Sequence, residues 1–305
     1  MQQNQNTTAI PFFTVVIPTH NRSNLLKRAV KSVLAQTLEN YEIIIVDDHS
    51  TDDTASAVKS FSDLRIRYMI NSLTKGASGA RNVGIFSAKG KWVAFLDDDD
   101  VWFPKKLEYQ YGLAKNASKI IGLICTDYEI CKEKNRKLIV HKNRPSGWVN
   151  DRLLYGGIIG CLSSICVRTE VLKTIGGFDE RFPSCQDQDL FLRVAELSQF
   201  AHVPKTLVRM YQELRNRIGQ NPKSKLDGYI LFRNKYSSLI NKSLRLRNRY
   251  ESHIFIYALL RNKKSLVLKC LPWVVLGILV DFSHFLLTLR TVLILLLRKR
   301  TQARI

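Results

Sequence analysis

The first hundred residues alternate between short apolar runs and longer stretches in which apolar positions recur every three or four residues. Such runs predict strands buried on both faces, and the stretches between them predict amphipathic helices. The four predicted strands are Phe13–Pro18, Glu42–Asp47, Ile66–Ile70 and Lys91–Leu96. Ser23 is the expected N-cap of the first helix. This order of elements predicts an α/β fold whose parallel sheet has helices on each side.

Beyond residue 107 the periodicity is weaker. The expected elements there are strands at 120–126, 162–167 and 207–211 and a helix at 187–197. Glycine, asparagine and proline cluster at 216–224, so we expect a domain boundary in this segment. The predicted organisation is a polar N-terminal segment at 1–10, an α/β domain at 11–215 and a basic, apolar helical region at 216–305.

Positive charge is concentrated in the last third of the chain. The net charge is +21, and residues 205–305 contain 21 Lys and Arg against four acids, a balance of +17. A basic region of this size predicts a polyanionic partner, either nucleic acid or an anionic membrane. The six cysteines show no CxxC spacing, and the N-terminus has no charged segment followed by an apolar one. We therefore expect reduced thiols and no secretory signal.

Polar clusters follow three of the predicted strands. They are Pro18–Asn21, Asp47–Asp48 and Asp97–Asp100. In open α/β sheets, ligands bind beyond the carboxyl ends of the strands. Because these ends lie at one edge of a parallel sheet, we expect the three clusters to form a single site.

Four consecutive carboxylates, Asp97–Asp100, are unusual in a basic chain. Neighbouring carboxylates repel one another, and a divalent cation would relieve that repulsion. In extended backbone Asp97 and Asp99 project to the same side, which provides two oxygen ligands for Mg²⁺ or Mn²⁺. The alternatives are a solvated acidic loop and a cap for a helix near Pro104. The position at the shared edge favours the metal site.

Three further features are candidates for the same site. The carboxylate of Asp48 could accept a hydrogen bond from a nucleobase or a ribose, or it could cap the next helix. The segment KGASGARN, residues 75–82, offers backbone amides and Arg81 to a phosphate, although such loops are commonly turns. Asp187 could act as a general base, or it could simply occupy the first turn of a helix.

Taken together, these motifs resemble glycosyltransferase family 2, whose members have the GT-A fold. The segments that carry the resemblance are VVIPTHNR (15–22), IIIVDDHSTDDT (43–54), GARNVGI (79–85), FLDDDDVW (95–102) and GGFDERFPSCQDQDL (176–190). They occur in the family's order, and the resemblance ends near Gln212. It implies a Rossmann-like mixed sheet flanked by helices, a nucleotide-sugar donor that is usually a UDP-sugar, and an inverting transfer to a hydroxyl.

The resemblance also implies roles for individual residues. Those expected to bind the nucleotide-sugar are Pro18, Thr19, Asn21, Asp48, Arg81, Asp97 and Asp98. Asp97-x-Asp99 would be the DXD motif, with Asp99 as the direct ligand of Mn²⁺ or Mg²⁺ and Asp97 directed toward the ribose or the metal. Asp187 would be the general base. Gln186 departs from the family, which usually has Glu there, and Gln212-Glu213 stands where some members have His.

The apolar tail, residues 271–297, is interrupted by Asp281, His284 and Arg290. Its uninterrupted part, Leu271–Val280, is shorter than the roughly 20 residues that span a bilayer. Basic residues flank the tail on both sides. This pattern predicts an amphipathic helix at an anionic membrane surface. The alternatives are a soluble helical subdomain and a tilted transmembrane helix.

The sequence therefore predicts an inverting, metal-dependent glycosyltransferase, peripheral or monotopic at the cytoplasmic face of a bacterial inner membrane. It would extend a polyprenyl-diphosphate-linked saccharide in O-antigen or capsule synthesis. The alternatives are a soluble glycosyltransferase with another acceptor, a nucleic-acid-binding protein and an inactive scaffold. The tail lacks the interleaved aromatic residues of a nucleic-acid platform, so we expect no nucleic acid as partner. Acids at each expected catalytic and metal position argue against the scaffold.

Overall fold

The computed structural model describes residues 10–132, 137–141, 144–156, 159–212 and 221–302. The chain divides into two compact units. The first unit comprises Met1–Leu153, Gly157–Glu180 and Leu190–Leu214, and the second comprises Leu154–Gly156, Arg181–Asp189 and Arg215–Ile305. The predicted boundary at 215–216 lies outside the described residues, as does nearly all of the predicted N-terminal segment 1–10, so the predicted domain limits stay predictions.

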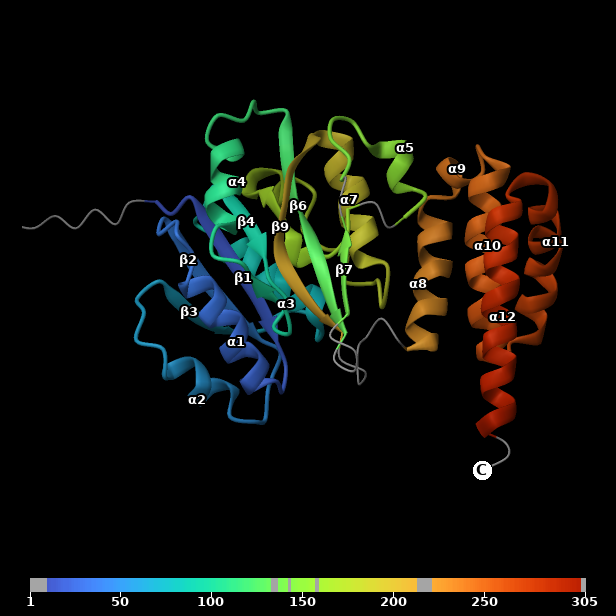
Figure 1. Ribbon diagram of the computed structural model, residues 1–305, viewed down its shortest axis with the longest axis horizontal. Coiled ribbons are helices and arrows are strands. Elements are labelled where there is room, and N and C mark those ends of the chain that lie inside the picture. Colours follow the sequence, from blue (N-terminus) through green and yellow to red (C-terminus); the bar gives the residue numbers. More distant parts are fainter. Residues whose placement is uncertain (1–9, 133–136, 142–143, 157–158, 213–220, 303–305) are drawn as a thin grey trace, which may run out of the picture. The chain divides into compact units, whose positions relative to one another are not determined.

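Within the described part of the first unit, nine strands form one sheet (Figure 1). Their order across the sheet is β3 (Ile66–Ile70), β2 (Tyr41–Asp47), β1 (Phe13–Thr19), β4 (Trp92–Phe95), β8 (Ile165–Arg168), β6 (Ile121–Lys132), β9 (Gln199–Gln212) and β5 (Val101–Trp102), with β7 (Lys137–His141) beside β6. Strands β3, β2, β1 and β4 are parallel, whereas β8 is antiparallel to both β4 and β6. The predicted mixed sheet is confirmed.

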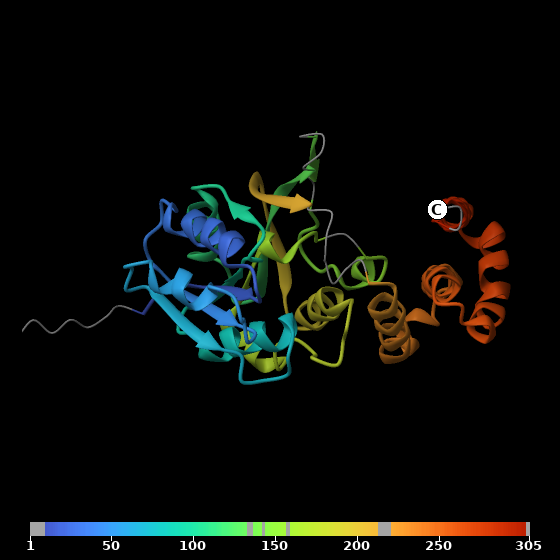
Figure 2. The same ribbon diagram turned by 90° about the horizontal axis from the view of Figure 1, so that it is seen from below.

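Helices cover both faces of this sheet. The helices of the first unit are α1 (Ser23–Leu34), α2 (Thr54–Lys59), α3 (Ala77–Ser87), α4 (Lys106–Ala114), α5 (Asn150–Leu153), the 3₁₀ helix η1 (Leu162–Ser164), α6 (Thr169–Thr174) and the larger part of α7 (Gln186–Leu197). The strand order runs outward from β1 to β3 and then returns to β4, so right-handed crossovers place α1 and α3 on opposite faces. Figure 2 shows this arrangement, with α1 in blue and α3 in teal.

Side chains of β1 alternate between the two layers, as expected for a strand. Val15 packs with Leu26 and Val30 of α1 in the main apolar core, and all three are fully buried. Val16 faces α3 instead, where a Cβ added to Gly84 would collide with it. This burial on both faces explains why the strand reads as a continuous apolar run.

Several details of the sequence prediction were wrong in this unit. The strand predicted at 162–167 begins only at Ile165, because residues 162–164 form η1. Ser23 is the first residue of α1 rather than its cap, and its N–H donates to Asp52 Oδ2 at 3.1 Å, so the capping oxygen comes from the loop after β2. Strands β6 and β9 are both longer than predicted. Their pairing shifts register on either side of Asp127, and such irregularities interrupt the alternation on which a prediction depends.

A lysine lies inside the apolar core of the first unit. The side chain of Lys106 on α4 is fully buried, and its Nζ donates to Gln110 Oε1 at 2.8 Å. The same nitrogen lies 3.8 Å from the ring centroid of Trp102. Burial lowers the pKa of Lys106 to about 7, because a charged amine loses its hydration there.

The second unit is helical. Its helices are α8 (Pro222–Lys235), α9 (Ser237–Ile240), α10 (Leu244–Leu260), α11 (Lys264–Val280) and α12 (Phe282–Gln302). Figure 1 shows α10, α11 and α12 side by side, and the three pack against one another. A small apolar core includes Ile254 and Ala258 of α10 with Cys270 and Val274 of α11. The predicted helical C-terminal region is therefore present.

Asp281 separates α11 from α12 and is almost completely buried. Its carboxylate accepts hydrogen bonds from Arg245 Nε at 3.0 Å and Arg249 Nε at 2.7 Å, both on α10. It also accepts the Ser283 hydroxyl at 3.1 Å. Burial alone would raise the pKa of Asp281, but the hydrogen bonds from the two arginines hold it well below its usual range. About two turns further along, Thr288 is buried as well, so the polar face of α12 is turned inward.

The outward faces of α11 and α12 are apolar. Ten large apolar side chains on residues 268–293 are more than two-fifths exposed; they are Leu268, Leu271, Val275, Ile278, Leu279, Phe282, Leu286, Leu287, Leu289 and Leu293. On α11 these positions fall along one stripe of the helix. We call these ten side chains the apolar face. Among the described residues, no helix combines the length and the hydropathy needed to cross a bilayer.

Candidate active site at the carboxyl ends of the strands

The four acids after β4 form a turn. Leu96 N–H still donates to Val16 O, and the Asp100 N–H then closes the turn on Asp97 O at 3.0 Å. The backbone here is therefore not extended, which was the condition for Asp97 and Asp99 to project to the same side. One carboxylate oxygen from each of Asp97, Asp99 and Asp100 lies within 4.8 Å of the others. The turn thus adds Asp100 to the two acids expected to face each other.

Asp98 points to the end of β1 instead. It accepts the Thr19 hydroxyl at 2.9 Å and Arg22 Nη1 at 3.1 Å, and its side chain is almost completely buried. Burial raises the pKa of Asp98 to about 6, against the opposing effect of the Arg22 charge. Of the four consecutive acids, Asp98 therefore anchors the turn to the neighbouring strand.

Ser163 of η1 holds the other side of the turn. Its hydroxyl accepts the Asp97 N–H at 3.1 Å and donates to Asp100 Oδ2 at 2.7 Å. Arg28 Nη2 donates to the Asp99 carbonyl at 2.6 Å. Neither Ser163 nor Arg28 was predicted. Their contacts join segments more than sixty residues apart, and no local pattern marks them.

Arg81 and Asp48 lie on the other side of the edge where the parallel strands end, which we call the rim. Arg81, buried on α3, donates to Asp97 Oδ1 at 2.7 Å, so it reaches the acidic turn directly. Asp48 accepts Asn71 Nδ2 at 2.7 Å and the Gly76 N–H at 2.9 Å. The Asp48 carboxylate does not cap the next helix. It accepts the Gly76 N–H, which the sequence predicted to be available to a phosphate.

The two remaining predicted residues of the rim, Pro18 and Asn21, shape its loops. Pro18 pairs with Val46 near the end of β1. Asn21 has a positive φ of 52°, and its Oδ1 accepts the Thr51 N–H at 2.7 Å. The loop after β1 is thereby tied to the loop after β2. The predicted residues of the first unit thus form one connected set.

Asp187 lies in the second unit, in the first turn of α7. Its place relative to the acidic turn stays a prediction. Its neighbours are held firmly: Asp189 accepts the Tyr236 hydroxyl at 2.8 Å, and Gln188 Nε2 donates to the Tyr250 hydroxyl at 2.8 Å. Aromatic residues of α8 to α10 therefore support the turn that carries Asp187. The predicted position at Gln212-Glu213 cannot be compared, because Glu213 lies outside the described residues.

The carboxylates of Asp97, Asp99 and Asp100 have the chemistry of a divalent-metal site. Mg²⁺ and Mn²⁺ prefer oxygen ligands, and three carboxylates within 4.8 Å provide them. Arg22 and Arg81 lie next to the cluster and offset part of its negative charge. The residues present therefore fit such an ion.

Residues 14–176 match the model of glycosyl transferase family 2. WcaA of Escherichia coli K12, a putative colanic acid biosynthesis glycosyl transferase, is 31% identical over 267 residues, which cover 83% of this chain and 90% of the relative. WfgD of Escherichia coli, a UDP-Glc:alpha-D-GlcNAc-diphosphoundecaprenol beta-1,3-glucosyltransferase, is 37% identical over 158 residues, or 51% of this chain. An uncharacterized glycosyltransferase of Rickettsia bellii is 32% identical over 203 residues, or 64% of this chain. The chain spans 60% of the length of WfgD and 29% of the length of the Rickettsia protein.

Among solved structures, the fold is similar to that of S. aureus TarS in complex with UDP-GlcNAc. The TM-score is 0.62 at 19% identity, over 80% of this chain and 71% of the TarS 1–349 chain. A TarS structure in complex with UDP gives a TM-score of 0.58 at 16% identity, over 90% of this chain and 88% of the other. The predicted GT-A-like fold is confirmed.

Proposed function

The chain belongs to glycosyl transferase family 2, and from that premise we propose that it transfers a sugar from a UDP-sugar to a lipid-linked saccharide. The acceptor would be a polyprenyl diphosphate saccharide of surface-polysaccharide synthesis, and the transfer would invert the anomeric centre. Two relatives support this choice: WfgD acts on a diphosphoundecaprenol-linked GlcNAc, and WcaA is a putative glycosyl transferase of colanic acid biosynthesis. The observation that carries the proposal is the cluster of Asp97, Asp99 and Asp100 at the edge where the parallel strands end.

On the donor side, the chain's own residues divide the work. Asp48 is held by Asn71 and the Gly76 amide, so its position at the rim is fixed before the nucleotide arrives. Arg81 keeps Asp97 oriented through their 2.7 Å ion pair. Asp99, Asp97 and Asp100 would hold Mg²⁺ or Mn²⁺. When bound, the ion would supply positive charge next to the donor diphosphate.

On the acceptor side, Asp187 is the proposed general base. A base must lie within hydrogen-bond reach of the hydroxyl whose proton it accepts, and it must be ionised. Asp189 and Gln188 hold the first turn of α7 through Tyr236 and Tyr250, which supports a fixed position for the carboxylate of Asp187. Gln186 adds no second charge beside the base, unlike the Glu that is usual in the family.

The apolar face supports contact with a membrane, where such an acceptor would be found. Ten exposed large apolar side chains on two adjacent helices exceed what a surface in water normally carries. Lys263 precedes α11, Lys264 is its first residue, and Arg290 lies on α12. Basic residues at the border of an apolar face favour an anionic leaflet by about 1 kcal/mol each. We therefore propose that α11 and α12 lie in the surface of an anionic bilayer, at the cytoplasmic face of the inner membrane.

The enzymatic proposal is tested by turnover of a panel of UDP-sugars with a synthetic lipid diphosphate saccharide, with and without Mn²⁺ or Mg²⁺. We expect one UDP-sugar to be consumed in a metal-dependent reaction that gives an inverted linkage. Asp187→Asn should reduce the transfer rate on the order of 10³-fold, because an amide cannot accept the proton of the acceptor hydroxyl as the Asp187 carboxylate does. The matched control is Glu196→Gln, an exposed acid on the same helix, which should leave the rate unchanged. Near wild-type transfer by Asp187→Asn would show that the base is another residue.

The membrane proposal is tested by co-sedimentation with vesicles of phosphatidylcholine and phosphatidylglycerol. Leu279→Glu combined with Leu286→Glu should weaken binding at least about tenfold, because two apolar side chains would then carry charge. Leu64→Glu is the control, since Leu64 is fully exposed but lies in the first unit. Equal binding by the double variant and the control would contradict membrane contact through this face.

A further inference from the structure

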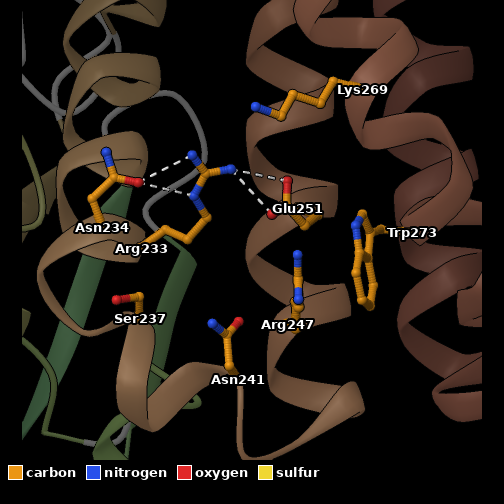
Figure 3. Close-up of a pocket in the computed structure, with 8 residues that line it drawn as sticks. All are labelled: Arg233, Asn234, Ser237, Asn241, Arg247, Glu251, Lys269 and Trp273. Carbon is orange, nitrogen blue, oxygen red and sulfur yellow. Dashed lines mark hydrogen bonds and ion pairs between the residues drawn. The ribbon is translucent and has the colours of Figure 1, made fainter.

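A polar pocket of about 240 Å³ lies within the second unit and is lined by residues of α8, α10 and α11 and by Ser237 and Asn241 at the two ends of α9 (Figure 3). Pockets for drug-sized ligands are typically about 300–1,000 Å³, so this one suits a smaller group. Arg233 and Glu251 form an ion pair at 3.1 Å at its centre. In Figure 3, Asn241 and Arg247 point toward this pair, and Lys269 lies on its other side. None of these residues belongs to the site at the rim.

The carboxylate of Glu251 and the amide oxygen of Asn234 already accept hydrogen bonds in the pocket. Arg233 Nη1 donates to both carboxylate oxygens of Glu251, at 3.1 and 3.3 Å. The Cys270 thiol donates to Glu251 Oε2 at 3.2 Å. Arg233 also donates through Nε and Nη2 to Asn234 Oδ1, at 3.3 and 3.1 Å. A ligand would therefore find few acceptors for its own donors.

The donors, by contrast, are in surplus. Arg247 and Lys269 form no ion pair with any residue that the structure describes, although both line the pocket. The Arg247 guanidinium lies over the Trp273 ring, with Cζ 4.0 Å from the ring centroid. Stacking of this kind fixes the guanidinium plane while its N–H groups stay available at the edge. The amide of Asn241 adds another donor.

The net charge of the pocket also favours an anionic ligand. The pocket contains three cationic side chains, Arg233, Arg247 and Lys269, against the single carboxylate of Glu251. The Arg233–Glu251 pair already joins α8 to α10, so the other two cations are not needed for that contact. An excess of donors and of positive charge around a small space selects a compact anion with several acceptor oxygens. A phosphate has these properties, and arginine binds it through paired N–H groups.

We propose that this pocket binds a phosphate group carried by an amphiphile. Lys269 of the pocket is flanked on α11 by Leu268 and Leu271, which begin the exposed stripe of the apolar face. A phosphate seated beside Lys269 would therefore have an apolar surface next to it for the attached chain. The phosphate chemistry follows from the pocket alone. The lipid source rests on the proposed membrane contact.

The test measures the reactivity of individual lysines in the full-length protein. An amine-reactive acylating reagent is applied with inorganic pyrophosphate, with phosphatidylcholine vesicles, or with vesicles that also contain phosphatidylglycerol, and labelling is read by peptide mass spectrometry. We expect labelling of Lys269 to slow at least about tenfold with a saturating anion. Lys264, at the start of the same helix, reports general shielding and should change much less. A diphosphate held at the rim does not affect this readout, because the signal comes from Lys269.

Two arginine variants separate the pocket from bulk charge. Arg247→Gln should raise the pyrophosphate concentration needed for half-protection of Lys269 by about tenfold, since a paired donor is lost. Arg261→Gln removes the same charge from an exposed position at the end of α10 and should have no effect. If Arg247→Gln reduces the amount of folded protein, Lys269→Gln tests the same site. It should weaken binding to anionic vesicles.

The outcomes discriminate. Protection by both pyrophosphate and anionic vesicles supports a general phosphate site, and protection by anionic vesicles alone supports a lipid headgroup. Equal protection of Lys264 and Lys269, no protection at all, or full protection in Arg247→Gln would overturn the proposal. Sugar transfer is measured on the same preparations. Sugar transfer without protection of Lys269 would contradict only the proposed phosphate site. Protection of Lys269 without any sugar transfer would contradict the proposed function and still support the phosphate site.

Discussion

The two units of this protein arrange apolar and polar side chains in opposite ways. In the first unit, Val15, Ile44 and other strand residues are fully buried, and the acids gather where the strands end. In the second unit, Asp281 between α11 and α12 and Thr288 of α12 are buried, while Leu279 and Leu286 are exposed at 84% and 49%. Both units keep their apolar side chains away from water if the exposed apolar side chains of the second unit contact something other than water. An apolar exterior around a polar contact is stable where part of the surroundings is lipid.

The largest expected effect lies at the rim. Asp99→Asn removes the charge of one ligand of the proposed metal site and should lower the transfer rate on the order of 10³-fold. The assay is initial rate against metal concentration. Asp151→Asn, an exposed acid of the same unit, should behave as wild type. If the metal dependence of Asp99→Asn were unchanged, the acidic turn would have a structural role only. The acids of the first unit would then not form a metal site.

The second prediction contrasts a leucine from each unit. Leu26→Ala should reduce the free energy of unfolding by about 3 kcal/mol, because it leaves a cavity in a fully buried core. Leu279→Ala, on the apolar face, should change it by less than about 0.5 kcal/mol in aqueous buffer. Urea unfolding followed by circular dichroism measures both. Similar losses for the two variants would show that Leu279 is covered by protein in solution.

The third prediction concerns the buried polar contact of the second unit. Asp281→Ala should destabilise this unit by about 2–3 kcal/mol, since Arg249 and Arg245 lose their shared partner. The pKa of Asp281 is lower in the folded state than the usual value of about 4, so its contribution is present above pH 4 and is lost as the pH falls further. Unfolding between pH 7 and pH 2 would measure this loss.

Asp227→Ala is the control for that experiment, because Asp227 is an exposed acid on α8. It should leave the acid transition unchanged. An Asp281→Ala variant whose acid transition coincides with that of the wild type would show that the inward polar face contributes nothing to the stability of the helices.

The smallest expected effect comes from Ser163. Ser163→Ala removes two hydrogen bonds to the acidic turn without touching the substrate, so kcat should fall by about tenfold and the metal concentration for half-activity should rise. Ser164→Ala is matched in size and position, but its hydroxyl donates to the Cys161 carbonyl instead. Identical behaviour of the two variants would mean that Ser163 does not position the acids.

The parallel half of the sheet could be predicted because each strand carries its own signal. Val15 and Val16 of β1 are both buried, on opposite faces, and a strand buried on both faces is written in the sequence as a continuous apolar run. The lengths of β6 and β9 could not be predicted, since the register shifts around Asp127 depend on the partner strand. The sequence marked the break at Asp281, but the direction of the polar face depends on Arg245 and Arg249 of another helix.

The rim shows the same division. Its acids were visible from their position after a strand, and Thr19 and Arg81 from motifs. The turn that adds Asp100 to the cluster was missed, because it is set by Ser163 of η1 and by Arg28 of α1. Both contacts exist only after the chain has folded. Tertiary contacts of this kind have no local signature, so even a well-marked motif leaves its geometry open.

The buried amine of Lys106 has a practical consequence for handling the protein. Its pKa of about 7 in the fold is below the value of about 10.4 expected for an unfolded lysine, so the unfolded chain binds more protons between these limits. Lys106 therefore adds stability to the first unit as the pH rises above about 7. Above the ordinary thiol pKa of about 8.5, the buried thiols of Cys125, Cys161 and Cys166 act in the opposite direction, because burial raises their pKa in the fold. The isoelectric point, about 9.9, lies near the top of the same interval. Raising the pH toward the isoelectric point therefore combines the stability gained at Lys106 with weaker repulsion between molecules, which promotes precipitation.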